Sequence, residues 1–260
     1  MTGRGFNHDP VVKSEIVSFF NTIRMSEDAY IYATAILVIL ITLVIVAVWS
    51  RRKTSRRVVL LLGLSDSGKT LIFSRLLHDK FVNTYTSIKE NVGDYIVKNS
   101  CLRIVDIPGH ERLRYKFFDH YKNMTGGIVY VIDSVTFQKK IRDIAEFLYS
   151  LLSDPVVMAN CPRFLILCNK QDDSTSNDCN GMQSLLEKEM DLLRVTKTRQ
   201  LQSTEETGNK NIFLGKKGAD FKFSHINRIN VSFGEAAALN QGISEPAELD
   251  CLKDWLEESF

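Results

Sequence analysis

The stretch Gly63-Leu-Ser-Asp-Ser-Gly68-Lys69-Thr70 decides the fold class of this 260-residue chain. The apolar run Val58–Gly63 leads into it, and the helical stretch Lys69–His78 leads out of it. Its spacing is G-x-x-x-x-G-K-[ST], which forms a loop whose backbone N–H groups point inward at phosphate oxygens. The N-terminus of the following helix adds partial positive charge. The stretch therefore predicts a nucleoside triphosphate site between a buried parallel strand and a helix.

Two side chains of this loop have specific expected roles. Lys69 is expected to reach the β- and γ-phosphates, and the hydroxyl of Thr70 is expected to bind Mg²⁺. The residues that we expect to line the phosphate site are Gly63, Leu64, Ser65, Asp66, Ser67, Gly68, Lys69, Thr70 and Leu71.

Outward from the loop, short apolar runs alternate with helical stretches. The predicted strands are Val58–Gly63, Cys101–Asp106, Gly127–Asp133, Phe164–Asn169 and Ile229–Ser232. The predicted helices are Lys69–His78, Phe137–Leu152, Met182–Leu193 and Ala247–Leu256. This alternation predicts an α/β fold with a mostly parallel sheet and helices on both faces, whose ligands bind at the carboxyl ends of the strands. The polar stretch Thr196–Asp220 is expected to be a long, partly flexible surface loop.

Asp106-Ile-Pro-Gly109 ends the second predicted strand. The carboxylate of Asp106 can hold Mg²⁺ through a water, and the N–H of Gly109 can contact the γ-phosphate. D-x-x-G alone is a weak pattern, but its place one predicted strand after the phosphate loop supports this role.

Asn169-Lys170-Gln171-Asp172 ends another predicted strand and selects the base. The carboxylate of Asp172 can accept two hydrogen bonds from guanine, whose N1–H and 2-amino donors adenine lacks. A buried carboxylate left unpaired by ATP would be strongly unfavourable. The stem of Lys170 can cover the base plane, and Asn169 can tie this segment to the phosphate loop. The motif predicts GTP or GDP as the ligand; a chance surface turn is the weaker alternative.

Residues 29–49 read AYIYATAILVILITLVIVAVW and contain no charged residue. At a rise of about 1.5 Å per residue they match the roughly 30 Å hydrocarbon core of a bilayer. Five basic residues follow between Arg51 and Arg57, whereas the preceding 28 residues hold three. A cleaved signal peptide would instead have a shorter apolar core and small residues after it. We expect a lumenal tail over 1–28, one transmembrane helix over 29–49, a basic linker over 50–57 and a cytosolic domain over 58–260.

Composition excludes several functions. A net charge of +2 argues against a surface that mainly faces nucleic acid. The cysteines are odd in number, scattered and without a C-x-x-C pair, which argues against a disulfide framework or a zinc site and fits a reducing compartment. The five are Cys101, Cys161, Cys168, Cys179 and Cys251, and most of them are expected to be small core residues.

The motif order GLSDSGKT, DIPGH and NKQD resembles Ras-like small GTPases of the P-loop NTPase class, in particular their Arf and Sar branches. With the N-terminal apolar span, TYTSI, DIPGHERLR and a late LGKKG, residues 29–260 resemble the beta subunit family of the signal recognition particle receptor. The resemblance implies a GTP-dependent heterodimer with the alpha subunit, single-pass anchoring in the endoplasmic reticulum membrane, and a role in co-translational targeting. Ribosome or translocon are further candidate partners, and no direct nucleic-acid binding is expected.

The resemblance also implies further site residues. Thr86, within Thr84-Tyr85-Thr86-Ser87, matches the switch threonine that binds Mg²⁺, with Thr84 and Ser87 as alternatives. Val231-Ser232-Phe233-Gly234 matches a Ser-Ala-Lys-like loop whose backbone N–H groups contact guanine, although Phe233 and Gly234 depart from that pattern. The implied metal ligands are Thr70, Thr86 and, through a water, Asp106.

Slow hydrolysis is expected from the residues around the γ-phosphate. His110, the candidate catalytic residue, follows D-x-P-G where Ras-like GTPases commonly carry a water-orienting glutamine. A histidine can hydrogen-bond a water, but it differs from glutamine in geometry and protonation. Arg112 and Arg114 are expected on a solvated helix face rather than as an arginine finger. Three roles remain open: a switch subunit of the receptor, a membrane-tethered trafficking GTPase, and a scaffold that holds GTP structurally.

Overall fold

The computed structural model describes residues 30–32, 34–46, 57–98, 100–203, 213–216, 218–226, 228–239 and 246–260. The chain divides into two units, residues 1–55 and residues 56–260. In the first unit, residues 34–46 are helical. None of the helices that the structure describes has the length and apolarity needed to cross a membrane. The predicted span over 29–49 lies partly outside the described residues. The tail over 1–28 lies wholly outside them, and so does the basic linker except for Arg57.

The second unit is built on a six-stranded sheet with the order β2-β3-β1-β4-β5-β6. Four of its strand pairs are parallel, and only β2 and β3 pair antiparallel. The predicted parallel sheet is therefore confirmed. The strands are β1 (Val58–Leu62), β2 (Asn91–Val97), β3 (Ser100–Asp106), β4 (Thr125–Asp133), β5 (Arg163–Asn169) and β6 (Val231–Glu235).

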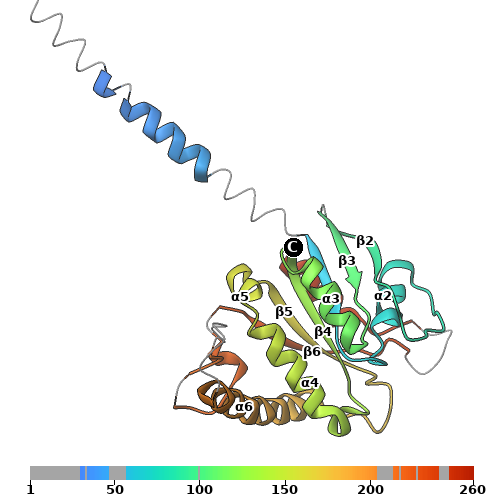
Figure 1. Ribbon diagram of the computed structural model, residues 1–260. Coiled ribbons are helices and arrows are strands. Elements are labelled where there is room, and N and C mark those ends of the chain that lie inside the picture. The colour runs from blue at the N-terminus through green and yellow to red at the C-terminus, as the bar shows by residue number, and fades with distance from the viewer. Residues whose placement is uncertain are drawn as a thin grey trace, which may run out of the picture. The chain divides into compact units, whose positions relative to one another are not determined.

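The helices cover both faces of this sheet, as predicted. One apolar cluster joins α3, α4 and α6 to one face, and a second joins α2 and α7 to the other (Figure 1). Successive residues of β1 alternate between these clusters, because neighbouring side chains of a strand point to opposite faces. The helices are α2 (Lys69–His78), α3 (Glu111–Tyr121), α4 (Phe137–Leu152), α5 (Pro155–Asn160), α6 (Cys179–Ser203) and α7 (Asp250–Ser259), with a 3₁₀ turn at Phe223–His225.

One predicted loop differs from the structure in its bounds, and one strand was not predicted. The loop expected over Thr196–Asp220 begins later, because α6 continues to Ser203. Residues 204–212 and 217 of that loop lie outside the described residues. Strand β2 was not predicted, because it is an edge strand with Asn91, Gly93 and Asp94 in its sequence and only its last residue buried.

The expectation that most of the cysteines lie in the core is also wrong. Cys101, Cys161 and Cys251 are exposed, and only Cys168 and Cys179 are buried. Cys161 ends α5 in a left-handed conformation, which places it at the surface end of that helix. All five thiols are free.

Gly181→Ala is expected to stabilise the fold by about 0.5–1 kcal/mol, because Gly181 lies within α6 and glycine disfavours a helix by this amount relative to alanine. A Cβ there would meet nothing closer than Asp178 Oδ2 at 4.0 Å. Urea denaturation measures the change. Gly218→Ala is the contrasting variant, since Gly218 has equal space but a φ of +80° that disfavours alanine. Equal stabilisation by both substitutions would contradict this account.

Candidate functional site

The loop between β1 and α2 is held close to neighbouring strands by its glycines. Gly68 has a φ of +89°, and a Cβ on it would lie 2.2 Å from Asn169 Nδ2. Gly109 faces the same loop after β3, and a Cβ there would lie 2.5 Å from the backbone nitrogen of Ser65. The backbone thus forms a tight cradle at the carboxyl ends of the strands, which suits a ligand that is bound by N–H groups.

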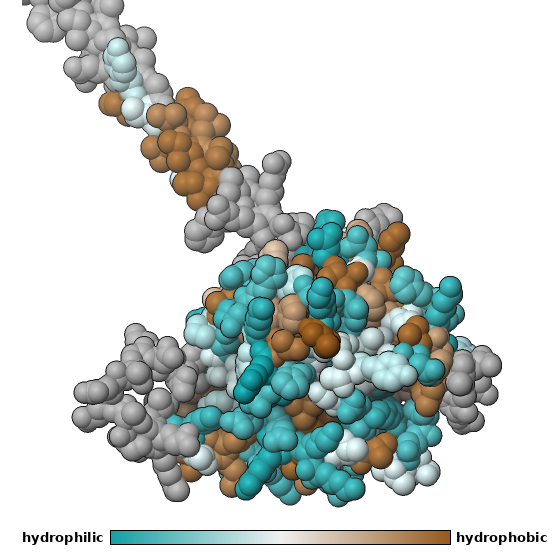
Figure 2. Space-filling model, turned by 45° about the vertical axis from the view of Figure 1, so that its right-hand side comes forward, coloured by the Kyte–Doolittle hydropathy of each residue, from teal (hydrophilic) through white to brown (hydrophobic). Residues whose placement is uncertain are grey.

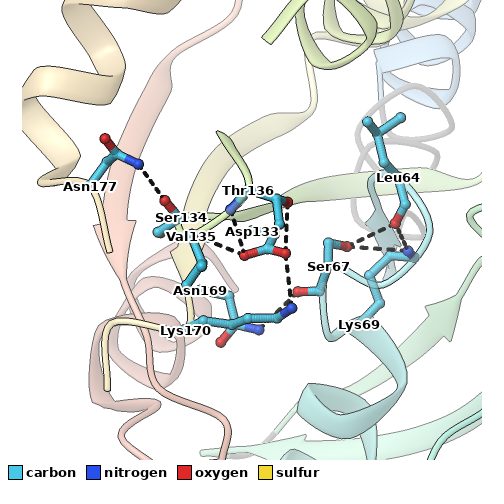
Figure 3. Close-up of polar contacts among 10 residues, drawn as sticks. All are labelled: Leu64, Ser67, Lys69, Asp133, Ser134, Val135, Thr136, Asn169, Lys170 and Asn177. Atoms are coloured by element: carbon cyan, nitrogen blue, oxygen red, sulfur yellow. Dashed lines mark hydrogen bonds and ion pairs between the residues drawn. The ribbon is translucent and has the colours of Figure 1, made fainter. Parts of the chain in front are cut away.

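Lys69 is buried inside this cradle, with 6% of its surface exposed. Its Nζ donates a hydrogen bond to the carbonyl oxygen of Leu64 at 2.6 Å and another to Ser67 Oγ at 3.3 Å (Figure 3). Burial lowers the pKa of Lys69 to about 8, although the carboxylates of Asp106 and Asp66 oppose this shift. An ammonium whose hydrogen bonds go to neutral oxygens is suited to receive an anion such as phosphate.

A groove beside the cradle brings three predicted segments together. The phosphate loop, the segment over 84–87 and the segment after β3 all line it. Its lining residues are Ser65, Asp66, Gly68, Lys69, Thr70, Thr84, Tyr85, Thr86, Ser87, Ile107, Pro108 and Gly109.

The carboxylate of Asp106 lies at the base of the site and is 1% exposed. Its Oδ2 accepts hydrogen bonds from Thr70 Oγ1 at 2.7 Å and from Asn91 Nδ2 at 2.9 Å. Its Oδ1 is buried and has no hydrogen-bond partner among the described residues. Burial raises the pKa of Asp106, while the bonds from Thr70 and Asn91 and the charge of Lys69 oppose the shift. A buried carboxylate oxygen without a partner fits an oxygen-preferring cation.

The hydroxyl found beside Thr70 belongs to Ser87. The two hydroxyl oxygens are 3.3 Å apart, whereas Thr86 lines the groove. Ser87, one of the alternatives left open by the sequence, is thus nearest to the Thr70–Asp106 pair in this conformation.

The predicted base-binding segment is joined to the phosphate loop by Asn169. Its Nδ2 donates a hydrogen bond to the carbonyl oxygen of Ser67 at 2.9 Å, which confirms the predicted link. Lys170 forms an ion pair with Asp133 Oδ2 at 2.9 Å, and Asp133 also accepts a hydrogen bond from the backbone N–H of Val135 (Figure 3). Burial tends to raise the pKa of Asp133, but the bonds from Lys170, Thr136 and Val135 outweigh it and lower the pKa overall. Asp133 was not among the predicted site residues.

Asp172 has an acceptor in this segment that no described residue pairs. Its Oδ1 is buried and unpaired within the described part of the chain. The segment is braced from the side, because Gln171 Nε2 donates to Ser134 Oγ at 3.0 Å and Asn177 Nδ2 donates to the carbonyl oxygen of Ser134 at 2.6 Å. A fixed carboxylate with a buried free oxygen can recognise a ligand that carries hydrogen-bond donors.

The loop predicted over Val231–Gly234 is not a loop. These residues lie in β6, with Ser232 in register with Leu165, and the ring of Phe233 packs on Phe223 at a centroid distance of 5.2 Å. The chain leaves the strand later. Ala236 accepts a hydrogen bond from the N–H of Gln171 at 3.2 Å, and the N–H of Ala238 donates to Asn169 Oδ1 at 3.2 Å. Residues 236–238 therefore contact the base-binding segment, and the apolar run before them led to a strand prediction that ended too early.

Residues 54–231 of the chain match the model of the family described as the signal recognition particle receptor beta subunit. The chain belongs to this family. The rat beta subunit is 42% identical over 229 residues, which cover 86% of this chain and 84% of that protein. The Dictyostelium discoideum beta subunit is 33% identical over 79% of this chain and 71% of its own length.

Solved structures agree with the family assignment. The structure of the mammalian SRP receptor matches with 39% identity and a TM-score of 0.68, covering 78% of this chain and all of that chain. The GDP- and Mg-bound SRb of Chaetomium thermophilum matches with 19% identity and a TM-score of 0.59, covering 78% of this chain and 97% of that chain. At this identity the second match shows the shared fold alone.

The basic residues that follow Gly109 do not line the groove. His110 is exposed, precedes α3 and does not line the groove. Arg114 is 9% exposed, and its guanidinium lies 4.3 Å from the ring centroid of Phe147, so its assignment to a solvated face is wrong. An aromatic ring takes the place of water here through a cation–π contact. Arg112 is exposed, as expected.

Asn169→Ala is expected to lower the free energy of unfolding by about 2–4 kcal/mol, because it leaves the carbonyl of Ser67 and the N–H of Ala238 without their partner. Urea denaturation of the ligand-free protein measures this loss. Asn180→Ala is the matched control, since Asn180 is exposed on α6 and is expected to change stability by less than about 0.5 kcal/mol. Similar losses in both variants would contradict the bridging role of Asn169.

Proposed function

We propose that this chain binds GTP and GDP with Mg²⁺ in the described groove and that the nucleotide state controls its association with an alpha subunit. The observation that carries the proposal is the hydrogen bond between Asn169 and Ser67, which joins a phosphate cradle to the segment that holds Asp172. One buried oxygen of Asp172 has no partner among the described residues. That arrangement suits a ligand with phosphates at one end and hydrogen-bond donors at the other. Guanine nucleotides have both.

The hydroxyl and carboxylate oxygens around the groove are also suitable ligands for Mg²⁺. The Thr70 hydroxyl would hold the ion directly, Asp106 would hold it through a water, and a hydroxyl of residues 84–87 would complete the set. When bound, the ion neutralises phosphate charge. Lys69 would contact the phosphate oxygens, and the backbone N–H of Gly109 would meet the γ-phosphate.

The segment after β5 would recognise the base. Asp172 would accept the two donors of guanine, and Lys170 would lie along the base. We assign the backbone contacts that the sequence placed at Ser232 and Phe233 to residues 236–238, which adjoin Asn169 and Gln171.

Slow intrinsic hydrolysis is part of this proposal. His110 is exposed outside the groove-lining set, and Arg114 is engaged by aromatic rings. Neither is placed to orient water in this conformation. A single-turnover assay with the chain alone is expected to show slow hydrolysis, and a rate typical of partner-stimulated GTPases would contradict this.

The partner surface in this proposal is the exposed part of the groove edge. Tyr85 is 89% exposed and Ile88 is 76% exposed, and both lie in the segment that would respond to the γ-phosphate. A solved relative from Chaetomium thermophilum is a complex of GTP-bound SRb with SRX. We propose the corresponding GTP-dependent contact with an alpha subunit here.

Capture of the alpha subunit tests the switch. The full chain in detergent micelles is loaded with GDP or with a non-hydrolysable GTP analogue and incubated with purified alpha subunit. We expect retention by the GTP-analogue form and little retention by the GDP form. Equal retention in both states would favour a scaffold that holds GTP as a structural ligand.

We also propose that residues 29–49 span the endoplasmic reticulum membrane once, with residues 58–260 cytosolic. The support is the uncharged sequence over 29–49, the basic cluster after it, and the apolar side chains around the described helix of residues 34–46 (Figure 2). Protease treatment of sealed microsomes is expected to remove residues 58–260 and protect the tail. Release of the whole chain by alkaline carbonate would contradict anchoring.

A further inference from the structure

Two buried cysteines flank the proposed base-binding segment. Cys168 lies in β5 immediately before Asn169, and Cys179 is the first residue of α6. Their sulfur atoms are 3.3 Å apart, and the side chains belong to residues that are 0% and 8% exposed. The residues between them include Asn169, Lys170 and Asp172, so a bond between the two sulfurs would close a ring around the base-binding segment.

The two sulfurs are not equivalent. The thiol of Cys168 donates a hydrogen bond to the sulfur of Cys179, which raises the pKa of Cys168 and lowers that of Cys179. The N-terminal position of Cys179 in a 25-residue helix also favours a thiolate. Burial of Cys179 and the nearby carboxylates of Glu235 and Asp178 act in the opposite direction. Cys179 is also the more exposed of the two, so it is the sulfur that an oxidant would meet first.

We propose that Cys168 and Cys179 form a reversible dithiol–disulfide site, oxidised by hydroperoxides, that changes the geometry of the base-binding segment. The Cys179 thiolate attacks one peroxide oxygen of hydrogen peroxide, the O–O bond breaks, and the departing hydroxide takes a proton to become water. The resulting sulfenic acid is attacked by the sulfur of Cys168, which forms the S–S bond and releases the oxygen as a second water. The two sulfurs together lose two electrons, and the peroxide gains them. A small thiol such as dithiothreitol reverses the reaction by exchange.

The bond would pull the segment toward the sheet. A disulfide is about 2.05 Å long, so the sulfurs must approach by more than 1 Å. Cys168 is held in β5 between β4 and β6, whereas Cys179 follows a connecting segment. The segment from Asp172 to Cys179 therefore takes up the movement. This displaces Asp172 and weakens guanine binding, a consequence that rests on the proposed function.

Peptide mapping tests the site without any nucleotide. The full chain in detergent micelles is treated with hydrogen peroxide, free thiols are blocked with N-ethylmaleimide, and peptides are identified by mass spectrometry. We expect a Cys168–Cys179 linked peptide, two hydrogens lighter than the sum of its parts, which disappears with dithiothreitol. Cys179→Ser should abolish it, and Cys251→Ser, which removes an exposed thiol, should leave it unchanged. Separate modification of both cysteines with no linked peptide would overturn the proposal.

Release of a fluorescent GDP analogue tests the consequence. The oxidised chain is expected to release it about tenfold faster than the reduced chain, as when a hydrogen bond to a charged group is weakened. The Cys179→Ser chain is expected to show no response to peroxide. Equal release from the oxidised and reduced chains would overturn the effect on the base-binding segment. Failure of the reduced chain to bind the analogue would instead contradict the proposed function, and the linked peptide would still report the disulfide.

Discussion

Asp172→Asn is expected to lower the affinity of the chain for GTP by about a thousandfold, because a site built around specific hydrogen bonds rejects a mismatched partner strongly. The carboxylate of Asp172 has a buried oxygen that the described residues leave unpaired, so guanine's N1–H and 2-amino group would be its partners. An asparagine amide group would face the 2-amino group with donors instead. Competition with a fluorescent GDP analogue measures the change.

The neighbouring carboxylate supplies the control for this experiment. Asp173 is exposed and its Oδ1 accepts hydrogen bonds from the N–H and hydroxyl of Thr175, so Asp173→Asn should leave GTP affinity within about threefold. Xanthine nucleotide carries an oxo group where guanine has the 2-amino group, and it should bind better to the Asp172→Asn chain than to the parent. Unchanged GTP affinity in that chain would refute the role of Asp172.

Lys69→Ala is expected to weaken GTP binding by at least about a hundredfold, because it removes a charged donor from the centre of the phosphate cradle. The ammonium is buried beside the carbonyl oxygen of Leu64, and burial lowers its pKa to about 8. The fold therefore disfavours this charge when no ligand is bound. Titration with a fluorescent GTP analogue at pH 7 measures the loss.

Thermal denaturation separates a binding effect from an unfolding effect in this variant. The ligand-free Lys69→Ala chain is expected to melt at or above the temperature of the parent, since the substitution removes a buried charge. The added stability that GTP gives to the parent should be absent. Lys98→Ala is the control, because Lys98 is exposed and pairs with Glu257 far along the chain. A large drop in the melting temperature of ligand-free Lys69→Ala would contradict a ligand-binding role.

Local patterns were sufficient for much of the sheet. The bounds of α2 and α4 agree with the sequence prediction, since both carry regular apolar spacing that packs on the sheet. The parallel strands agree because strands covered on both faces read as continuous apolar runs. Strand β2 was missed because it lies at the edge of the sheet and its sequence, NVGDYIV, mixes polar and apolar residues. The bounds of α3 were not predicted, although Arg112 and Arg114 were expected on a helix, because its sequence, ERLRYKFFDHY, is rich in charge and has few buried residues.

The guanine-contacting loop was misplaced for a different reason. Ser232-Phe233-Gly234 stands where the family resemblance implies such a loop, but pairing with β5 holds it in β6. The burial of Arg114 also depends on tertiary packing. Its charge predicts a solvent-exposed side chain, whereas Phe147 on another helix covers it.

By itself, the sequence determined the class of site, since the phosphate loop, Asp106 and the Asn169–Asp172 segment depend on local backbone chemistry and side-chain type. Only the tertiary structure decided which groups meet. Thr70 bonds Asp106 across 36 positions and Asn169 bonds Ser67 across 102, and both contacts depend on the order and register of strands. The same order places Ser87 beside Thr70, residues 236–238 beside Asn169, and the sulfurs of Cys168 and Cys179 in contact. The spacing of apolar residues in the sequence indicates which side chains are buried. The residue that each side chain contacts depends on how distant segments of the chain pack.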